Sequence, residues 1–114
     1  MELVHQIKED CLLLILKGDL LGENSSTEIL EIVNNAISNK IVAVAIDLAG
    51  VRYINSSGLG VLITLLTKTK NKEGDIVLIN PSEQVNKLLR ITRLDSVFTS
   101  FETKEEAFRK LKSK

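Results

Sequence analysis

The chain has 114 residues, a length that fits one domain and supports one hydrophobic core without disulfides or metal. Hydrophobic residues make up 44% and charged residues 26%, which is a globular rather than a disordered composition. Fifteen basic and fifteen acidic residues cancel, which argues against a nucleic-acid partner and against a polybasic membrane anchor. We therefore expect one domain over residues 1–114, with no nucleic-acid partner and no membrane insertion.

The N-terminal residues and the single cysteine favour a cytoplasmic location. Residues 1–6 lack the basic and apolar regions of a signal peptide, and no apolar run approaches the roughly 20 residues of a membrane span. Cys11 has no partner for an intramolecular disulfide. It precedes a run of leucines and isoleucine, so we interpret it as a small residue at the start of a buried strand rather than a reactive thiol.

The first half of the chain alternates between strand-like and helix-like segments. Residues 3–7 and 12–17 are predicted strands, and the turn signal at 8–10 makes them an antiparallel hairpin. A helix follows, for which Ser25 and Glu28 fit a capping box. Its predicted apolar face consists of Ile29, Ile32, Val33, Ala36 and Ile37. Residues 41–48 are nearly all apolar, as expected of a central strand that is covered on both faces.

The second half continues the alternation. A helix is predicted over 57–72 with a stop near Gly74, then a strand over 76–79 and a helix opened by Pro81 and Ser82. A last strand over 97–101 precedes a helix with a Thr103–Glu106 capping box. The order β-β-α-β-α-β-α-β-α predicts an α/β fold, with a mixed, mostly parallel sheet packed with helices. The first strand is the antiparallel exception.

The segment Asn55-Ser56-Ser57-Gly58-Leu59-Gly60 is the main candidate site. Ligand sites of open α/β sheets gather beyond the carboxyl ends of the strands, and this segment follows the central strand. The 19–24 loop and the 80–82 turn are predicted at the same end, so the three segments should form one surface. Two serines at a helix start allow two interpretations, because such a serine either caps the helix or carries a phosphate that the terminus accommodates.

Enzymatic interpretations find little support in the residues. The only histidine, His5, belongs to the first predicted strand, where it is expected to be an exposed edge residue rather than the base of a serine triad. The serines do not lie in a G-x-S-x-G elbow, and Ser57 to Gly60 lack the features of dinucleotide and P-loop motifs. No His/Cys cluster is available for metal. We predict no catalytic residue, no metal site and no cofactor.

The motif resembles a known family. Residues 47–62, DLAGVRYINSSGLGVL, are similar to the signature of the STAS domain, and more narrowly to bacterial anti-sigma factor antagonists, also called anti-anti-sigma factors. In these proteins a strand ends in a hydrophobic residue, which is followed by D-S-S-G-L-G and a helix. The element order and the length agree as well, so the resemblance covers the whole chain and implies a single STAS-like domain.

The resemblance also implies a function, which is regulatory rather than enzymatic. In the family, the unphosphorylated protein binds an anti-sigma factor that is a serine kinase, and so frees the sigma factor. The kinase phosphorylates the first serine of the pair, which matches Ser56, and a serine phosphatase reverses the modification. The residues that match the helix start bordering the partner are Asn55, Ser57, Gly58, Leu59 and Gly60.

Two departures from the family pattern are visible. Asn55 replaces the usual aspartate before the serines, which keeps the shape and one acceptor oxygen but removes the charge. Leu21 occupies a loop where many relatives carry an acidic residue, although Asp19 and Glu23 flank it. The alternative interpretation is a STAS scaffold or adaptor in a signalling or transport assembly, in which the serines serve only as helix caps.

Overall fold

The structure, a computed structural model, describes residues 2–22 and 24–112, without the side chains of residues 24 and 25. Within these residues the predicted order of strands and helices is confirmed, with one short 3-10 helix in addition. The strands are β1 (Glu2–Lys8), β2 (Cys11–Leu20), β3 (Ala43–Ile54), β4 (Asp75–Ile79) and β5 (Thr99–Phe101). The helices are α1 (Asn24–Ser38), α2 (Ser56–Asn71), α3 (Glu83–Ile91) and α4 (Lys104–Lys112), with the 3-10 helix at Leu94–Ser96.

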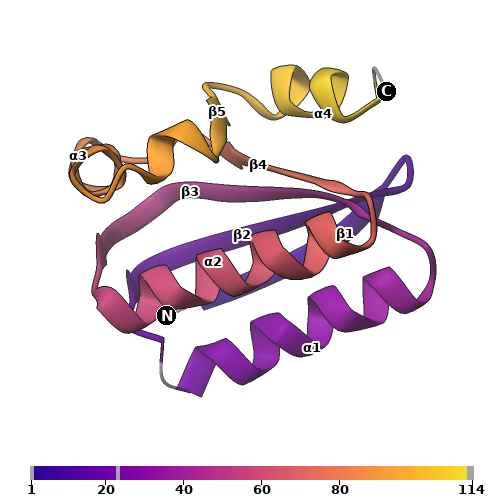
Figure 1. The fold of residues 1–114 in the computed structure, drawn as a ribbon, viewed down its shortest axis with the longest axis horizontal. Coiled ribbons are helices and arrows are strands. Elements are labelled where there is room, and N and C mark those ends of the chain that lie inside the picture. The colour runs from indigo at the N-terminus through magenta and orange to yellow at the C-terminus, as the bar shows by residue number, and fades with distance from the viewer. Residues whose placement is uncertain (1, 23, 113–114) are drawn as a thin grey trace.

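All five strands form one sheet in the order β1-β2-β3-β4-β5. β1 and β2 are antiparallel, whereas the pairs β2–β3, β3–β4 and β4–β5 are parallel. Figure 1 shows the strands side by side in this order. The helices α1 and α2 lie next to one another on the same face of the sheet. The predicted mixed, mostly parallel sheet with one antiparallel strand is confirmed.

The alternation of side chains along β2 divides the core into two layers. Leu12, Leu14 and Leu16 belong to the larger cluster, whose helical members come from α1, α2 and α3. Cys11 and Leu13 point to the opposite face and join the smaller cluster, which α4 covers. Both faces of β2 are therefore buried, which explains why the run is apolar at every position rather than at every second one.

The central strand is longer than predicted. The apolar run indicated a strand ending at residue 48 and a turn through Gly50, but β3 continues to Ile54. Its first part pairs with both β2 and β4, while the part from Gly50 onwards pairs with β2 alone, with one irregularity in the register before Gly50 and another after Val51. An extension with one neighbour has a solvated side and admits polar residues, so the loss of continuous hydrophobicity did not mark the end of the strand.

Two of the four predicted helix starts are confirmed by capping hydrogen bonds. Ser82 caps α3, with its Oγ accepting from the Val85 N–H at 3.3 Å. Thr103 Oγ1 accepts from the Glu106 N–H at 3.2 Å and lies 3.1 Å from Glu106 Oε1. The proposed Ser25 cap depends on a side chain outside the described residues. No described helix combines the length and the apolar character that a bilayer span requires.

Cys11 provides a direct test of the core. Its side chain is buried, with 2% exposure, and burial raises the pKa of its thiol. Because the thiolate is the reactive form, native protein should react with an aromatic disulfide reagent far more slowly than protein unfolded in guanidinium chloride. Absorbance of the released thiolate measures both rates. Equal rates in the two states would contradict the placement of Cys11 in the core.

Candidate functional site

The candidate site begins where β3 ends and two backbone segments come into close contact. The Asn55 N–H donates to the Leu20 carbonyl at 3.3 Å, which ties the end of β3 to the end of β2. A Cβ on Gly58 would lie 2.1 Å from that same carbonyl oxygen, and a Cβ on Gly22 would lie 2.5 Å from the backbone of Ser57. The exit from β2 and the first turn of α2 therefore pack against one another as predicted, and glycines permit the contact.

The N-cap of α2 is Asn55, and not a serine. Asn55 has an extended backbone, and its Oδ1 accepts a hydrogen bond from the Gly58 N–H at 2.8 Å. The prediction that the helix begins at Ser57, with a serine available as its cap, is wrong by one residue. Asparagine and aspartate cap helices equally well, so the replacement of the family's aspartate by Asn55 preserves this local structure.

Capping by Asn55 leaves the two serines without a structural hydrogen bond in the described part of the chain. Ser56 and Ser57 are the first two residues of α2, and both are exposed. No described residue accepts a hydrogen bond from their hydroxyls or from their backbone N–H groups. The positive end of the helix dipole and these N–H groups together favour an anion at this position.

The other motif residues divide between the interior and the surface. Gly58 is buried against Leu20, and Leu59 is 9% exposed within the larger core cluster. Gly60 is half-buried, and a Cβ there would meet no atom within 4 Å. Packing therefore requires glycine at position 58, whereas nothing in the described structure requires it at position 60.

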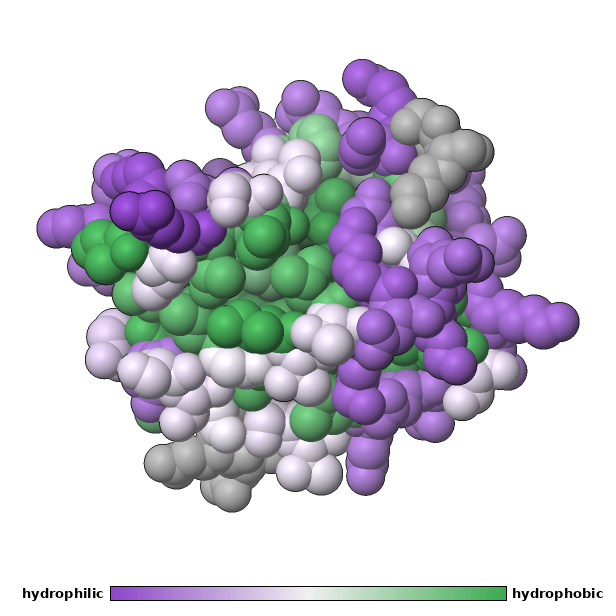
Figure 2. Space-filling view, viewed as in Figure 1, coloured by the Kyte–Doolittle hydropathy of each residue, from purple (hydrophilic) through white to green (hydrophobic). Residues whose placement is uncertain are grey.

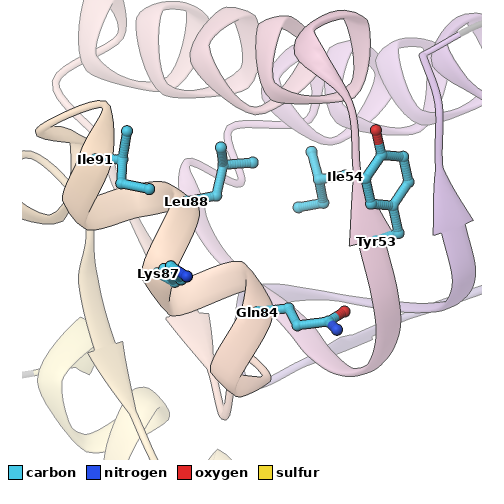
Figure 3. A pocket seen from close by; sticks show the side chains of 6 residues that line it. All are labelled: Tyr53, Ile54, Gln84, Lys87, Leu88 and Ile91. Atoms are coloured by element: carbon cyan, nitrogen blue, oxygen red, sulfur yellow. The ribbon is translucent and has the colours of Figure 1, made fainter.

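An apolar groove, which we call the β3–α3 groove, lies immediately before the serines in the chain. Tyr53 and Ile54 form one wall, and residues of α3 form the other, enclosing a hollow of about 340 Å³. Its lining consists of Tyr53, Ile54, Gln84, Lys87, Leu88 and Ile91. Figure 3 shows Ile54 and Leu88 facing one another across it, and Figure 2 shows apolar side chains gathered between α2 and α3.

The groove was not predicted from the sequence. Tyr53 and Ile91 are 55% and 68% exposed, so the groove presents apolar side chains to the solvent. In the sequence, α3 shows apolar residues at the i, i+3, i+4 and i+7 spacing of a single helical face. A signal was nevertheless present, since Ile91 lies outside the i, i+3, i+4, i+7 series formed by Val85, Leu88, Leu89 and Thr92.

The remaining predicted residues are placed as follows. His5 is exposed on the edge strand β1, and β2 separates that strand from β3, which leads into the serines. Asp19 belongs to β2 rather than to a loop, and its Oδ1 lies 3.5 Å from Arg52 of β3. The 80–82 turn opens α3, and the residues that line the β3–α3 groove come from that helix rather than from the turn. Among the described residues, no cluster of three or more metal-binding side chains occurs.

Comparison with known proteins identifies the family. A family model described as the STAS domain matches residues 2–107, and the chain belongs to this family. A protein of Thermotoga neapolitana, named as an anti-sigma factor antagonist homologue, is 26% identical over 110 residues, which cover 96% of this chain and 97% of the relative. The recognition of a STAS domain from residues 47–62 is thereby confirmed.

Solved structures share the fold. A crystal structure of an anti-sigma factor antagonist from Thermotoga maritima is 24% identical, has a TM-score of 0.86, and matches over 96% of this chain and 93% of its own. Unphosphorylated SpoIIAA is 19% identical with a TM-score of 0.84, over 99% of this chain and 98% of its own. The phosphorylated form of the Bacillus protein SpoIIAA is 18% identical with a TM-score of 0.79, over 97% of this chain and 100% of its own. The single STAS-like α/β domain is confirmed.

The assignment of the cap yields a prediction about stability. Asn55→Ala removes the acceptor for the Gly58 N–H, and we expect it to lower the free energy of unfolding by about 0.5–2 kcal/mol. Asn55→Asp keeps the cap and adds a charge that the helix dipole favours, so it should match or exceed the wild type. Ser57→Ala is the matched control and should change little. Urea denaturation followed by circular dichroism measures all three; a larger loss for Ser57→Ala would refute the assignment.

A pair of glycine substitutions tests the packing of the first turn of α2. Gly60→Ala has room for its methyl group and should raise the free energy of unfolding by about 0.5–1 kcal/mol, because alanine loses less entropy in a helix. Gly58→Ala forces a methyl group against the Leu20 carbonyl and should lower it by about 1–3 kcal/mol. Denaturation curves of the two variants should therefore move in opposite directions. A shift in the same direction would contradict the described contact.

Proposed function

We propose that this protein is an anti-sigma factor antagonist whose activity is switched by phosphorylation of Ser56. In its unphosphorylated form it binds an anti-sigma factor that has serine kinase activity, and this binding releases the sigma factor. The kinase then phosphorylates Ser56, and a serine phosphatase returns the protein to its binding form. The protein itself acts in the cytoplasm as a regulator of transcription and catalyses no reaction.

The observation that carries this proposal is that Asn55, and not Ser56, caps α2. The Ser56 hydroxyl is exposed and has no hydrogen-bond partner in the described structure, so a kinase can modify it without first breaking the helix start. The family membership and the names of the relatives support the same function. A serine needed as a cap would instead favour a purely structural role.

The electrostatics of the helix start support a switch that changes binding but not folding. A phosphate adds about −1.5 to −2 charges at neutral pH, and the N-terminus of α2 favours negative charge. The domain should therefore remain folded after phosphorylation. A partner packed over Ser56 would have to desolvate that charge or meet it with its own acidic groups. A loss of about 3 kcal/mol would weaken binding by about two orders of magnitude.

The proposed partner surface extends beyond the motif. Asn55, Ser57 and Gly60 lie at or near the surface and would contact the anti-sigma factor directly. Gly58 and Leu59 are buried and would contribute by holding this surface in place. The β3–α3 groove is continuous with the motif through Ile54 and Asn55, so we assign it to the same partner. Its exposed apolar side chains supply the hydrophobic area that serines and glycines lack.

Phosphorylation by the kinase tests the proposal directly. The protein is incubated with ATP and an anti-sigma factor kinase from the same cells, and the modified peptide is mapped by mass spectrometry. We expect phosphate on Ser56, complete loss of labelling in Ser56→Ala, and retained labelling in Ser57→Ala. Phosphate on Ser57, or labelling of neither serine, would contradict the switch and favour the scaffold interpretation.

Binding measurements then separate the charge effect from folding. Ser56→Asp places a charge at a terminus that favours it, so its melting temperature should remain close to that of the wild type. Its affinity for the anti-sigma factor, measured by calorimetric titration, should nevertheless fall by at least about tenfold. Lys104→Glu, at the start of α4 in the other layer of the fold, is the control for added negative charge and should bind like the wild type.

A further inference from the structure

The edge strand β1 carries features that neither the core nor the proposed partner site uses. It is seven residues long and pairs with β2 only, so its outer edge presents unpaired backbone groups. Val4 and Ile7 are 54% and 56% exposed. Of the described strands, β5 forms the opposite edge and has three residues, a length too short to serve as a template. The two edges of the sheet therefore differ in their capacity to accept another strand.

β1 lacks most of the devices that normally protect a sheet edge. Its seven residues contain neither proline nor glycine, and its pairing with β2 runs from Glu2 to Lys8 without a bulge. Two charged residues remain, Glu2 at one end and Lys8 at the other. No described residue forms an ion pair with either of them. The distribution of these charges determines which strand would fit.

We propose that β1 is a dimerisation surface on which β1 of a second copy of this chain pairs in an antiparallel arrangement. A two-fold axis at His5, the middle residue, overlaps all seven residues and places Glu2 of each copy opposite Lys8 of the other. The charges are therefore self-complementary in the one register of full overlap, and a one-residue or two-residue slip loses both pairs. The result is a continuous sheet across two molecules with an isologous interface.

The apolar residues agree with this register. Leu3 and Ile7 lie opposite Leu16 and Leu12 within the hairpin, on the face of the larger core cluster. In the dimer, Leu3 of each copy would lie opposite Ile7 of the other, so the apolar layer would continue across the two-fold axis. Pairing would also supply partners for the backbone groups on the open edge. This inference is independent of Ser56 and of the proposed anti-sigma partner.

Charge reversal provides a decisive test. Glu2→Lys alone places lysine opposite lysine across the interface, and Lys8→Glu alone places glutamate opposite glutamate. Each variant should associate at least about tenfold more weakly with itself than the wild type does, because both ion pairs become repulsive. An equimolar mixture of the two variants restores both pairs and should form a heterodimer. The double variant Glu2→Lys/Lys8→Glu should again form a homodimer.

Sedimentation velocity at low salt measures association, and native mass spectrometry of a mixture with one variant labelled with ¹⁵N identifies heterodimers. The wild-type dimer should have twice the 12.6 kDa mass of one chain. The protein must carry no N-terminal tag, since β1 begins at Glu2. Glu73→Lys and Lys104→Glu make the same charge changes at other exposed positions and should dimerise like the wild type.

The hairpin requires its own control, because Lys17 lies opposite Glu2 and Glu2→Lys creates a like-charge pair within the molecule. Thermal melts report this effect, and formation of the heterodimer shows that β1 of the Glu2→Lys variant still pairs. Three results would overturn the proposal: a wild type that stays monomeric up to about 1 mM, a dimer that survives both single reversals, or a mixture that forms no heterodimer. If the wild type stays monomeric, the open edge of β1 would be available only to a strand of a different protein.

Discussion

The close contact between the end of β2 and the first turn of α2 is the constraint on which the site depends. Leu20 supplies the carbonyl that accepts from Asn55, and Gly58 packs against that same carbonyl. The positive φ of Gly22 turns the chain away from β2 while its missing side chain makes room for Ser57. The end of β2, the end of β3 and the first turn of α2 therefore meet through backbone contacts. These contacts determine the direction in which α2 leaves the sheet, and with it the position of the exposed serines.

Within this contact, the structural roles belong to residues other than the two serines. Asn55 caps the helix, Gly58 and Leu59 anchor it, and Ser56 and Ser57 take no part in either task. This separation is what a reversible modification requires, because a phosphate then acts on the surface without removing a hydrogen bond from the fold. It also accounts for the tolerance of asparagine at a position that is aspartate in the family motif, since both side chains cap a helix through the same oxygen.

The fold was largely predictable because its signals are local and repeated. The alternation of strands and helices, the unbroken apolar character of β2 and the caps at Ser82 and Thr103 all depend on neighbouring residues. The end of β3 was not predictable in the same way. Residues 49–54 are held as a strand by pairing with one distant neighbour, so their composition carries no continuous hydrophobic pattern. The 3-10 helix before β5 likewise left no clear signal in the sequence.

By itself, the sequence determined the family, the order of the elements and the location of the motif at the end of the central strand. Tertiary structure alone decided which side chain caps α2, because helix starts differ by single residues and depend on how the preceding strand ends. It also decided that Gly58 is required by packing while Gly60 is not, since that distinction rests on the Leu20 carbonyl, 38 positions earlier than Gly58 in the chain. The β3–α3 groove and the open edge of β1 arise only when strands and helices from distant parts of the chain are assembled into one sheet.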